Sequence, residues 1–390
     1  MIVNDPYKAL GVRKAINAAG VLTRIGGSRS PPEVFRAMEE ASKSFVTIAE
    51  LQTAAGKVIA KATGAEAGFP TAGGSTAILL AAAACIMKGT ELEDYEPVGP
   101  AVWRKIAQRL PMRSEGLHTE FVVQKWNRDE YDHAVEIAGG RFIEVGSDNG
   151  ATEAEIEAAF NDKTAAYYYT YKSKPKGLPL EKLIEITHRH GVPIVIDAAG
   201  LPPPRSGLTK FSGLGVDLAC FCGGKTIAGP NNSGMLTGRA DLIKLAHLQS
   251  YPFEGVGRPS KMSRETIVGL ITALTIYLES DDSGVMDERI KTANKITGEL
   301  EAITGITSYI DYSGDAKNPL ACVKADKSIC GKSTRELFDA LKEGDPSIIT
   351  VYEPYFLLEK YHGLFSVNPQ FLSEDESEIV IRRIKEETVS

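Results

Sequence analysis

The chain has 390 residues, of which 43% are apolar and 24% are charged, so it can form a large core and does not have the composition of a disordered chain. This length favours two domains over one small core. A net charge of −7 and an isoelectric point of about 5.6 argue against a broad basic surface that would bind nucleic acid.

Cysteine usage and the N-terminus bear on the cellular compartment. The five cysteines are few, odd in number and scattered, which favours a reducing compartment over a disulfide framework. The first residues lack the basic start and apolar run of a signal peptide, and the most apolar stretch, residues 77–87, is shorter than the ~20 residues that span a bilayer. We therefore expect a cytoplasmic protein without membrane insertion. Cys220 and Cys222 do not have the spacing of a zinc site, so no metal is expected.

In chain order, residues 1–45 are expected to form an N-terminal arm that leads into a helix over residues 32–42. A segment with two consecutive glycines follows: Gly73, Gly74 and Ser75 open an alanine-rich stretch. Glycines and hydroxyl residues at a helix N-terminus present free amides and the positive end of the helix dipole to an anion. The segment predicts a phosphate site, although simple capping by Ser75 or Thr76 explains the same residues.

Short β-forming runs alternate with helical patterns through the middle of the chain. This is typical of an α/β fold in which helices cover both faces of a mostly parallel, doubly wound sheet, and we assign it to a large domain over residues 46–258. In such sheets, ligands bind beyond the carboxyl ends of the strands. The predicted strands are 121–124, 141–145, 165–171, 193–196, 218–221 and 234–237, and the predicted helices between them are 129–138, 153–160 and 180–190.

Two polar residues follow buried strands in this region. Asp197 ends the apolar run Pro193-Ile-Val-Ile, where a carboxylate is costly to bury without a partner. Lys225 follows the strand over 218–221 and two glycines, which let a flat cofactor approach the backbone, and lysine amines form Schiff bases with carbonyl groups. Each residue alone has a structural explanation, a helix cap for Asp197 and a solvated turn for Lys225.

After residue 258 the pattern changes to long helices over 264–279 and 286–303, followed by a smaller mixed region. We assign residues 259–390 to a small C-terminal α/β domain. Arg258 and Lys261 lie in a loop rich in glycine and proline at this junction, and Arg24 lies in the arm. Guanidinium and ammonium groups suit carboxylates and phosphates, so these three residues are candidate substrate-binding groups.

The glycine pair, Asp197 and Lys225 stand in the chain order of a fold-type-I pyridoxal 5′-phosphate (PLP) enzyme with the aspartate-aminotransferase-like fold. The chain resembles the selenocysteine synthase (L-seryl-tRNA(Sec) selenium transferase)-like family, above all its D-glucosaminate-6-phosphate ammonia-lyase branch. The matching motifs are Ile16-Asn-Ala-Ala-Gly20, Gly26-Gly-Ser28, Glu50-Leu-Gln52, Thr63-Gly-Ala-Glu-Ala67, Tyr131-Asp-His-Ala134, Asp197-Ala-Ala199, the Lys225 segment and Gly257-Arg-Pro-Ser-Lys261.

The resemblance implies specific roles. Lys225 would carry PLP as a Schiff base and move protons, Asp197 would pair with the pyridinium nitrogen, and Gly73, Gly74 and Ser75 would surround the phosphate. Cys222 replaces a serine near the phosphate, and Gly224 replaces an aspartate, so the local contacts should differ. A ring-stacking residue is expected in the loop after residue 124, where relatives often carry a histidine and this chain offers Trp126.

The resemblance also implies an activity and an assembly. We expect a lyase that eliminates a β-substituent from a small hydroxylated or phosphorylated amino acid, giving a keto acid and ammonia. Selenium transferase-like, aminotransferase and racemase activities use the same residues and stay open, as does a non-catalytic binding protein that retained the fold. A homo-oligomer, at least a dimer with the active site near the subunit interface, is expected, without nucleic acid or membrane partners.

Overall fold

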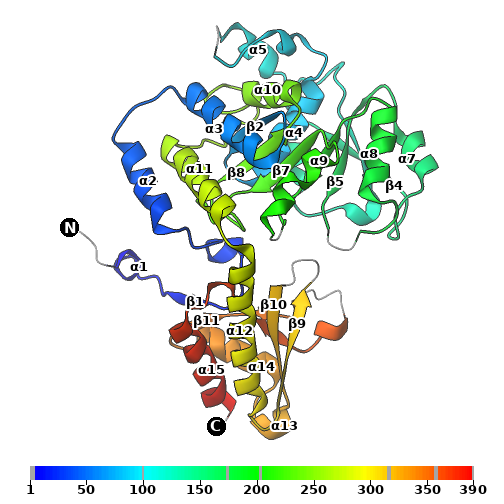
Figure 1. The fold of residues 1–390 in the computed structure, drawn as a ribbon. Helices are drawn as coiled ribbons and strands as arrows, with labels where there is room; N and C mark the ends of the chain where they lie inside the picture. Colours follow the sequence, from blue (N-terminus) through cyan, green and yellow to red (C-terminus); the bar gives the residue numbers. More distant parts are fainter. Residues whose placement is uncertain are drawn as a thin grey trace. The chain divides into compact units, whose positions relative to one another are not determined.

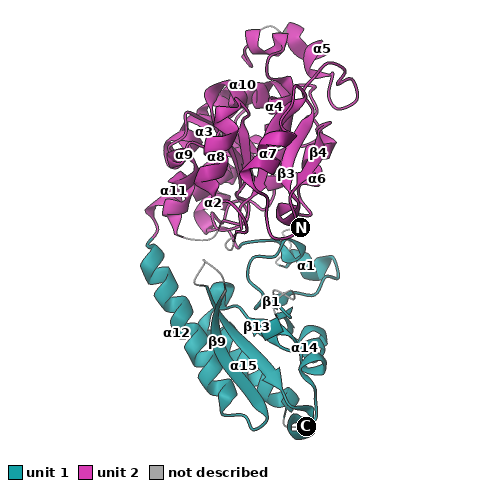
Figure 2. Cartoon of the chain, turned by 90° about the vertical axis from the view of Figure 1, so that its right-hand side faces the viewer, with its two compact units in different colours: residues 1–28, 281–390 teal, residues 29–280 magenta. Residues whose placement is uncertain are grey.

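The computed structural model describes residues 5–98, 101–172, 175–201, 204–313, 318–354 and 359–388. The chain forms two compact units, a large one over residues 29–280 and a small one made of residues 1–28 and 281–390 (Figure 2). The sequence predicts boundaries after residues 45 and 258, whereas the chain divides after residues 28 and 280.

Two helices account for this difference. Helix α2 (Pro32–Ser42) packs on helix α11 (Arg264–Glu279), and the Arg264 side chain donates to the carbonyl oxygens of Ala41 and Ser42 at 3.2 and 3.0 Å. The buried face of α11 belongs to the same core as the central strands. Both helices are therefore part of the large unit, and the loop around residue 259 lies within that unit.

A seven-stranded sheet in the order β2-β8-β7-β6-β5-β3-β4 forms the centre of the large unit (Figure 1). Only β8 runs antiparallel to its neighbours; all other pairs are parallel. This confirms the predicted doubly wound α/β fold. The strands are β2 (Ala67–Thr71), β3 (Glu120–Gln124), β4 (Arg141–Val145), β5 (Thr164–Thr170), β6 (Ile194–Asp197), β7 (Leu218–Cys222) and β8 (Gly234–Gly238).

The six predicted strands are confirmed to within one residue at each end. Strand β2 was not predicted, because glycine and Pro70 interrupt its β-forming pattern. Proline is tolerated in this strand because β2 is an edge strand that pairs only with β8. Among the helices, α7 (Glu153–Ala159) and α8 (Leu180–Arg189) match their predictions, while α6 (His133–Ile137) is shorter than predicted.

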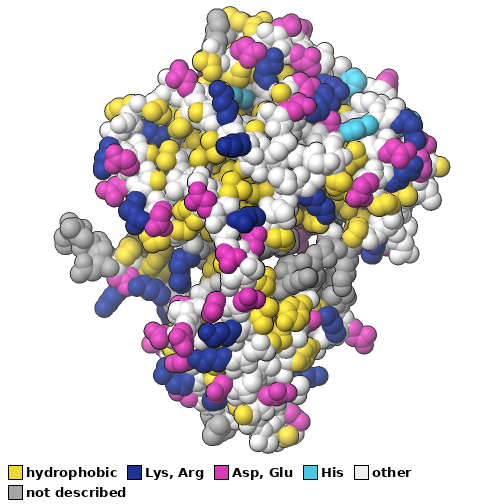
Figure 3. All heavy atoms as spheres, in the orientation of Figure 1, with side chains coloured by type: hydrophobic (Ala, Val, Ile, Leu, Met, Phe, Trp, Pro, Cys, Tyr) yellow, Lys and Arg dark blue, Asp and Glu magenta, His cyan; other side chains and the backbone are white. Residues whose placement is uncertain are grey.

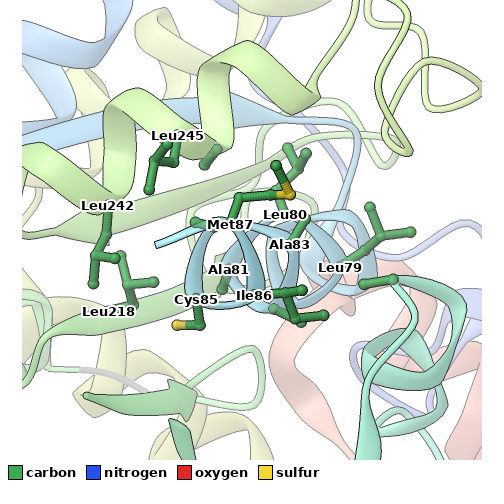
Figure 4. Close-up of a cluster of buried hydrophobic side chains, with 14 of the residues drawn as sticks. Leu79, Leu80, Ala81, Ala83, Cys85, Ile86, Met87, Leu218, Leu242 and Leu245 are labelled. Carbon is green, nitrogen blue, oxygen red and sulfur yellow. The ribbon is translucent and has the colours of Figure 1, made fainter. Parts of the chain in front are cut away.

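Helix α4 (Gly74–Met87) is buried on all sides and lies between the sheet and helix α10 (Ala240–Gln249). Its alanines are small enough for close packing, and Leu218 of β7 and Leu242 and Leu245 of α10 surround it (Figure 4). A helix that is apolar all round is expected in such a place. The opposite face of the sheet packs against α3 (Ile48–Thr63), α8, α9 (Lys210–Gly213) and α11.

The small unit contains residues from both ends of the chain. Strand β1 (Ala15–Asn17) pairs in parallel with β11 (Ser347–Ile349), so the N-terminal arm belongs to this unit up to residue 28. A four-stranded antiparallel sheet, β12-β13-β10-β9, packs against long helices. Its main elements are β9 (Ile306–Ser313), β10 (Asn318–Ala325), β12 (Val351–Tyr352), β13 (Phe365–Val367), α12 (Asp282–Glu301), α14 (Thr334–Glu343) and α15 (Glu374–Thr388).

None of the helices in the described part of the chain is both long and apolar enough to cross a membrane. All five cysteines are free thiols.

Candidate active site

Asp197 is the last residue of β6, and its side chain is only 5% exposed. Burial raises the pKa of this carboxyl to about 6, even though the Ala199 amide, which donates to Oδ1 at 2.8 Å, and the Lys225 ammonium both lower it. The carboxyl groups of Asp129 and Asp132 raise this pKa further. A buried carboxyl under these conditions is stabilised as a carboxylate by a cationic partner.

The predicted phosphate segment forms the first turn of α4. Gly73 caps this helix with φ of 115°, a value that favours glycine, and a β-carbon added there would meet no atom within 4 Å. The Thr71 hydroxyl donates to the Gly73 carbonyl oxygen at 3.0 Å and holds the turn. The first amides of α4 have no partner inside the helix, and the Ser75 side chain beside them is exposed. This end of the helix has the properties of an anion site.

The predicted segments converge on one place. A β-carbon added to Gly74 would lie 3.0 Å from Ala199 Cβ and 3.6 Å from Cys222 Cβ, so the start of α4 touches the chain beyond β6 and the end of β7. The Thr226 hydroxyl, next to Lys225, donates to the Leu201 carbonyl oxygen at 3.0 Å. Together with the effect of Lys225 on Asp197, these contacts bring the glycine turn, the acid and the lysine around a common edge of the sheet.

Lys225 is half-buried in a tight loop between β7 and β8. The Gly223 amide donates to the Ser233 carbonyl oxygen at 2.8 Å and closes the loop, and Ala228 N donates to the Lys225 carbonyl oxygen at 2.9 Å. A β-carbon added to Gly224 would lie 2.6 Å from Asn231 Cα. The loop thus leaves no room for a side chain at position 224.

The residues present fit PLP. Asp197 offers a buried carboxyl that needs a cation, as the pyridinium nitrogen would supply. The Thr170 hydroxyl, buried at the end of the neighbouring strand β5, has no hydrogen-bond partner among the described residues, so a polar group of the cofactor could satisfy it. The first turn of α4 would accept the phosphate without a cationic side chain.

Trp126 lies in the loop directly after β3, where it was expected, and its side chain packs against neighbouring residues. Its indole Nε1 donates to Gln124 Oε1 at 3.0 Å, and its ring packs edge-on against Tyr169, with the ring centres 6.3 Å apart. These contacts turn Trp126 towards the core on the side of the sheet opposite α4. These contacts favour a packing role for Trp126, and its stacking on the cofactor stays a prediction.

Tyr131 is the residue that the sequence analysis missed. It follows the same strand, β3, and its ring centre lies 5.9 Å from Lys225 Nζ. The sequence contained a signal, because Tyr131 begins one of the motifs shared with the resembling family, yet it gave no direction for the side chain. The residue was hidden inside a predicted helix that in fact starts only at His133.

The predicted substrate-binding residues lie in two separate units. Arg258 and Lys261 both stand over the ring of Tyr251, with the guanidinium carbon 5.3 Å and Lys261 Nζ 5.8 Å from its centre. Gln52 Nε2 donates a hydrogen bond to the Tyr251 carbonyl oxygen at 2.6 Å, which fixes the start of this loop. Arg24 is exposed in a short 3₁₀ turn of the small unit.

Charge is distributed evenly over the surface that Figure 3 presents. Lysine and arginine side chains alternate there with aspartate and glutamate side chains, and no field of one sign covers this face. This agrees with the acidic isoelectric point and gives no support to a nucleic-acid site on that face.

Comparison with known proteins gives the following similarities. Residues 134–327 match the model of the family Aminotransferase class-V. A 5′-C-glycyluridine monooxygenase-decarboxylase from a Streptomyces species is 31% identical over 391 residues, covering 97% of this chain and 91% of the relative. D-glucosaminate-6-phosphate ammonia lyase of Salmonella typhimurium is 29% identical over 391 residues and covers 97% of both chains. A solved structure of D-glucosaminate-6-phosphate ammonia-lyase is 28% identical, aligns over the whole of both chains and gives a TM-score of 0.83.

Proposed function

Because this chain belongs to the aminotransferase class-V family of PLP-dependent enzymes, we propose that it is a lyase that eliminates a β-substituent from a small hydroxylated or phosphorylated amino acid. The products are a keto acid and ammonia. The full-length likeness to an ammonia-lyase in sequence and in fold supports this activity.

One observation carries the proposal: the contacts of Gly74 with Ala199 and Cys222 gather the three predicted cofactor segments at one edge of the sheet. We assign the covalent attachment of PLP to Lys225, the pairing with its ring nitrogen to Asp197, and the phosphate to Gly73, Gly74 and Ser75. Cys222, whose Cβ faces Gly74, would border the phosphate with a thiol in place of a hydroxyl.

The chain's own residues would divide the chemistry as follows. When bound, the cofactor withdraws electrons from the substrate's Cα and stabilises a carbanion there. Asp197 would keep the ring nitrogen protonated, because its buried carboxylate is stabilised by a neighbouring positive charge. Lys225 Nζ would take the proton from the substrate's Cα, because it is the amine at this edge of the sheet that can act as a base.

Arg258 and Lys261 would bind a carboxylate or phosphate of the substrate, because the two cationic groups lie close together over the ring of Tyr251. Arg24 remains a further candidate for the same task.

We also propose a homo-oligomer, at least a dimer, with the active site near the interface. Phe45 is 94% exposed and Phe35 60% exposed in the single chain, and a second subunit would cover such side chains. Sedimentation of the holoenzyme tests this assembly. With its free thiols, the enzyme suits the cytoplasm.

A second candidate is an oxidative decarboxylation, favoured by the 31% identity to a monooxygenase-decarboxylase. Oxygen uptake and carbon dioxide release distinguish it from elimination, which needs no oxygen. Cα-deuterium exchange without keto acid would indicate a racemase, and keto acid formed only with an amino acceptor would indicate an aminotransferase. A selenium transferase-like activity fits the acidic isoelectric point less well, and a non-catalytic protein would not take up PLP.

The decisive test is the variant Lys225→Ala, with Lys163→Ala as a matched control because Lys163 is exposed before β5, at the other edge of the sheet. We expect wild type and control to show the visible absorbance band of covalently bound PLP, lost on borohydride reduction. Lys225→Ala should lack this band and lose at least about 10³-fold in ammonia release from a panel of D- and L-amino acids. A colourless wild-type protein that cannot take up PLP would contradict the proposal.

A further inference from the structure

Tyr131 is placed for a chemical role beside Lys225. Its ring centre lies 5.9 Å from Lys225 Nζ, and its side chain is 53% exposed in the single chain. The phenol makes no hydrogen bond to any of the described residues, in contrast to the indole of Trp126 and the amide of Asn127 in the same loop. The ring thus lies near the amine, and its hydroxyl group is available to a bound substrate.

The loop that carries Tyr131 is anchored to β5. Asn127 is fully buried, and its side chain both donates to the Thr170 carbonyl oxygen and accepts from the Thr170 amide, each at 2.8 Å. Lys172 Nζ donates to the Arg128 carbonyl oxygen at 3.2 Å. These bonds fix the start of the loop against the strand next to the one that ends in Asp197.

Hydrogen bonds from the Arg128 guanidinium to two carboxylates fix the rest of the loop. The Arg128 guanidinium donates to Asp132 and to Glu144 of β4, and it lies 4.3 Å from the ring centre of Phe142. Asp132 is 3% exposed and also accepts from the Asp129 amide at 3.1 Å, which closes the turn that contains Tyr131. The backbone around Tyr131 is therefore held by the buried side chains of Asn127 and Asp132, and a fixed loop favours the positioning of a group that acts on a substrate.

We propose that Tyr131 is a catalytic residue whose phenol protonates the leaving β-hydroxyl group of the substrate. This role rests on the proposed function, because it applies only to a reaction in which a β-hydroxyl leaves. Hydroxide is a poor leaving group, so elimination needs a proton at the oxygen as the bond to Cβ breaks. A phenol O–H group can supply that proton.

The protons balance within this pair of residues. Lys225 Nζ takes the proton from Cα, the Cβ–O bond breaks with its electrons on oxygen, and Tyr131 Oη donates its proton to that oxygen to give water. The Lys225 ammonium then returns a proton to the Tyr131 phenolate, directly or through that water, and both residues regain their starting states. The substrate has lost one water, and the released enamine hydrolyses to a keto acid and ammonia.

The test compares leaving groups that need a proton with one that does not. Serine and D-glucosaminate 6-phosphate lose a hydroxyl group, whereas β-chloroalanine loses chloride, which needs no acid; both enantiomers of serine and β-chloroalanine are used. We expect Tyr131→Phe to lower keto acid formation from the hydroxyl substrates by about 10² to 10⁴-fold. Its rate with β-chloroalanine should stay within about 3-fold of wild type, because the acid is then not needed.

Readouts that do not depend on turnover separate this role from a structural one. Tyr131→Phe keeps the ring and should keep the PLP dissociation constant and the visible band of wild type, whereas Tyr131→Ala should weaken PLP binding. Tyr309→Phe, on exposed strand β9 of the small unit, is the matched control and should change neither rate.

The outcomes distinguish this role from the function on which it rests. Equal losses with hydroxyl and chloride substrates, or no loss with either, would overturn the role of Tyr131 alone. Absence of keto acid from every probe with wild-type holoenzyme would overturn the elimination itself, and the role of Tyr131 with it.

Discussion

The loops that follow β6 and β3 leave the same edge of one sheet, but they orient their side chains by different means. Asp197 is the last residue of β6, so the alternation of the strand directs it to the same face as Val195, towards α4. Tyr131 stands well beyond the end of β3, where no alternation applies. Its direction comes from the bonds of Asn127 and Arg128 with residues of other strands.

The difference teaches where function can be found in a sequence. At a strand end, a residue's direction follows from its neighbours in the chain, and a polar residue there is informative at once. In a loop, the direction depends on partners distant in sequence, such as Thr170 and Glu144 for the loop after β3. Three substitutions probe this contrast, from the largest expected effect to the smallest.

Asp197→Asn tests the strand end. The pKa of this buried carboxyl, about 6, lies above its ordinary value of 3.8, so the folded apo protein loses stability as pH rises from about 4 through 6. Without PLP, the variant should therefore be more stable than wild type at pH 8, by at most about 3 kcal/mol in the free energy of unfolding. The gain should vanish below about pH 4. Urea unfolding of the apo proteins at several pH values measures it.

A second aspartate supplies the control for that experiment. Asp217 accepts hydrogen bonds from His188, Arg239 and the Ile194 amide, so Asp217→Asn should destabilise the protein. A gain at pH 8 for both variants, or a gain for Asp197→Asn that does not change with pH, would contradict the account of Asp197 as a carboxylate that needs a cation.

Asn127→Ala tests the loop. The substitution removes two hydrogen bonds and leaves the buried amide and carbonyl of Thr170 without these partners, which should cost about 2 kcal/mol of unfolding free energy. Because the loop carries Tyr131, the PLP dissociation constant should rise as well. Urea unfolding and a fluorescence titration with PLP measure the two effects. Lower stability with unchanged PLP affinity would show that Asn127 does not affect the cofactor site. It would contradict the view that bonds to other strands position this loop for function.

Trp126→Phe should have the smallest effect. It removes the bond from Nε1 to Gln124 but keeps an aromatic ring against Tyr169, so we expect a loss of about 1 kcal/mol in stability. The visible band and the affinity of PLP should stay those of wild type. A shifted band in this variant would restore Trp126 as a residue that contacts the cofactor.

Much of this fold follows from local pattern. The central strands are short runs of β-formers, and α4 is a continuous apolar stretch, so both are visible in the sequence. The edge strand β2 was missed because it tolerates Pro70, which only its unpaired edge permits. The unit boundaries were missed because they depend on the packing of α2 on α11, two helices far apart in the chain.

The site divides in the same way. The predictions for Gly73, Asp197 and Lys225 rest on their places next to a strand or helix end, whose geometry limits what a residue there can do. The directions of the aromatic side chains after β3 could not be predicted, because Trp126 and Tyr131 both lie in one loop. Which of them faces Lys225 depends on the hydrogen bond from the Trp126 indole to Gln124. No pattern in the sequence predicts this contact.

The antiparallel strand β8 lies between β2 and β7 and pairs with both. The turn that would hold the phosphate follows β2 but crosses the start of β8 and reaches the end of β7. A β-carbon added to Gly234, the first residue of β8, would lie 2.6 Å from the Gly73 carbonyl carbon, and one added to Gly74 would lie 3.6 Å from Cys222 Cβ. Any side chain at position 234 would therefore push this turn off the sheet and away from the loop that carries Lys225.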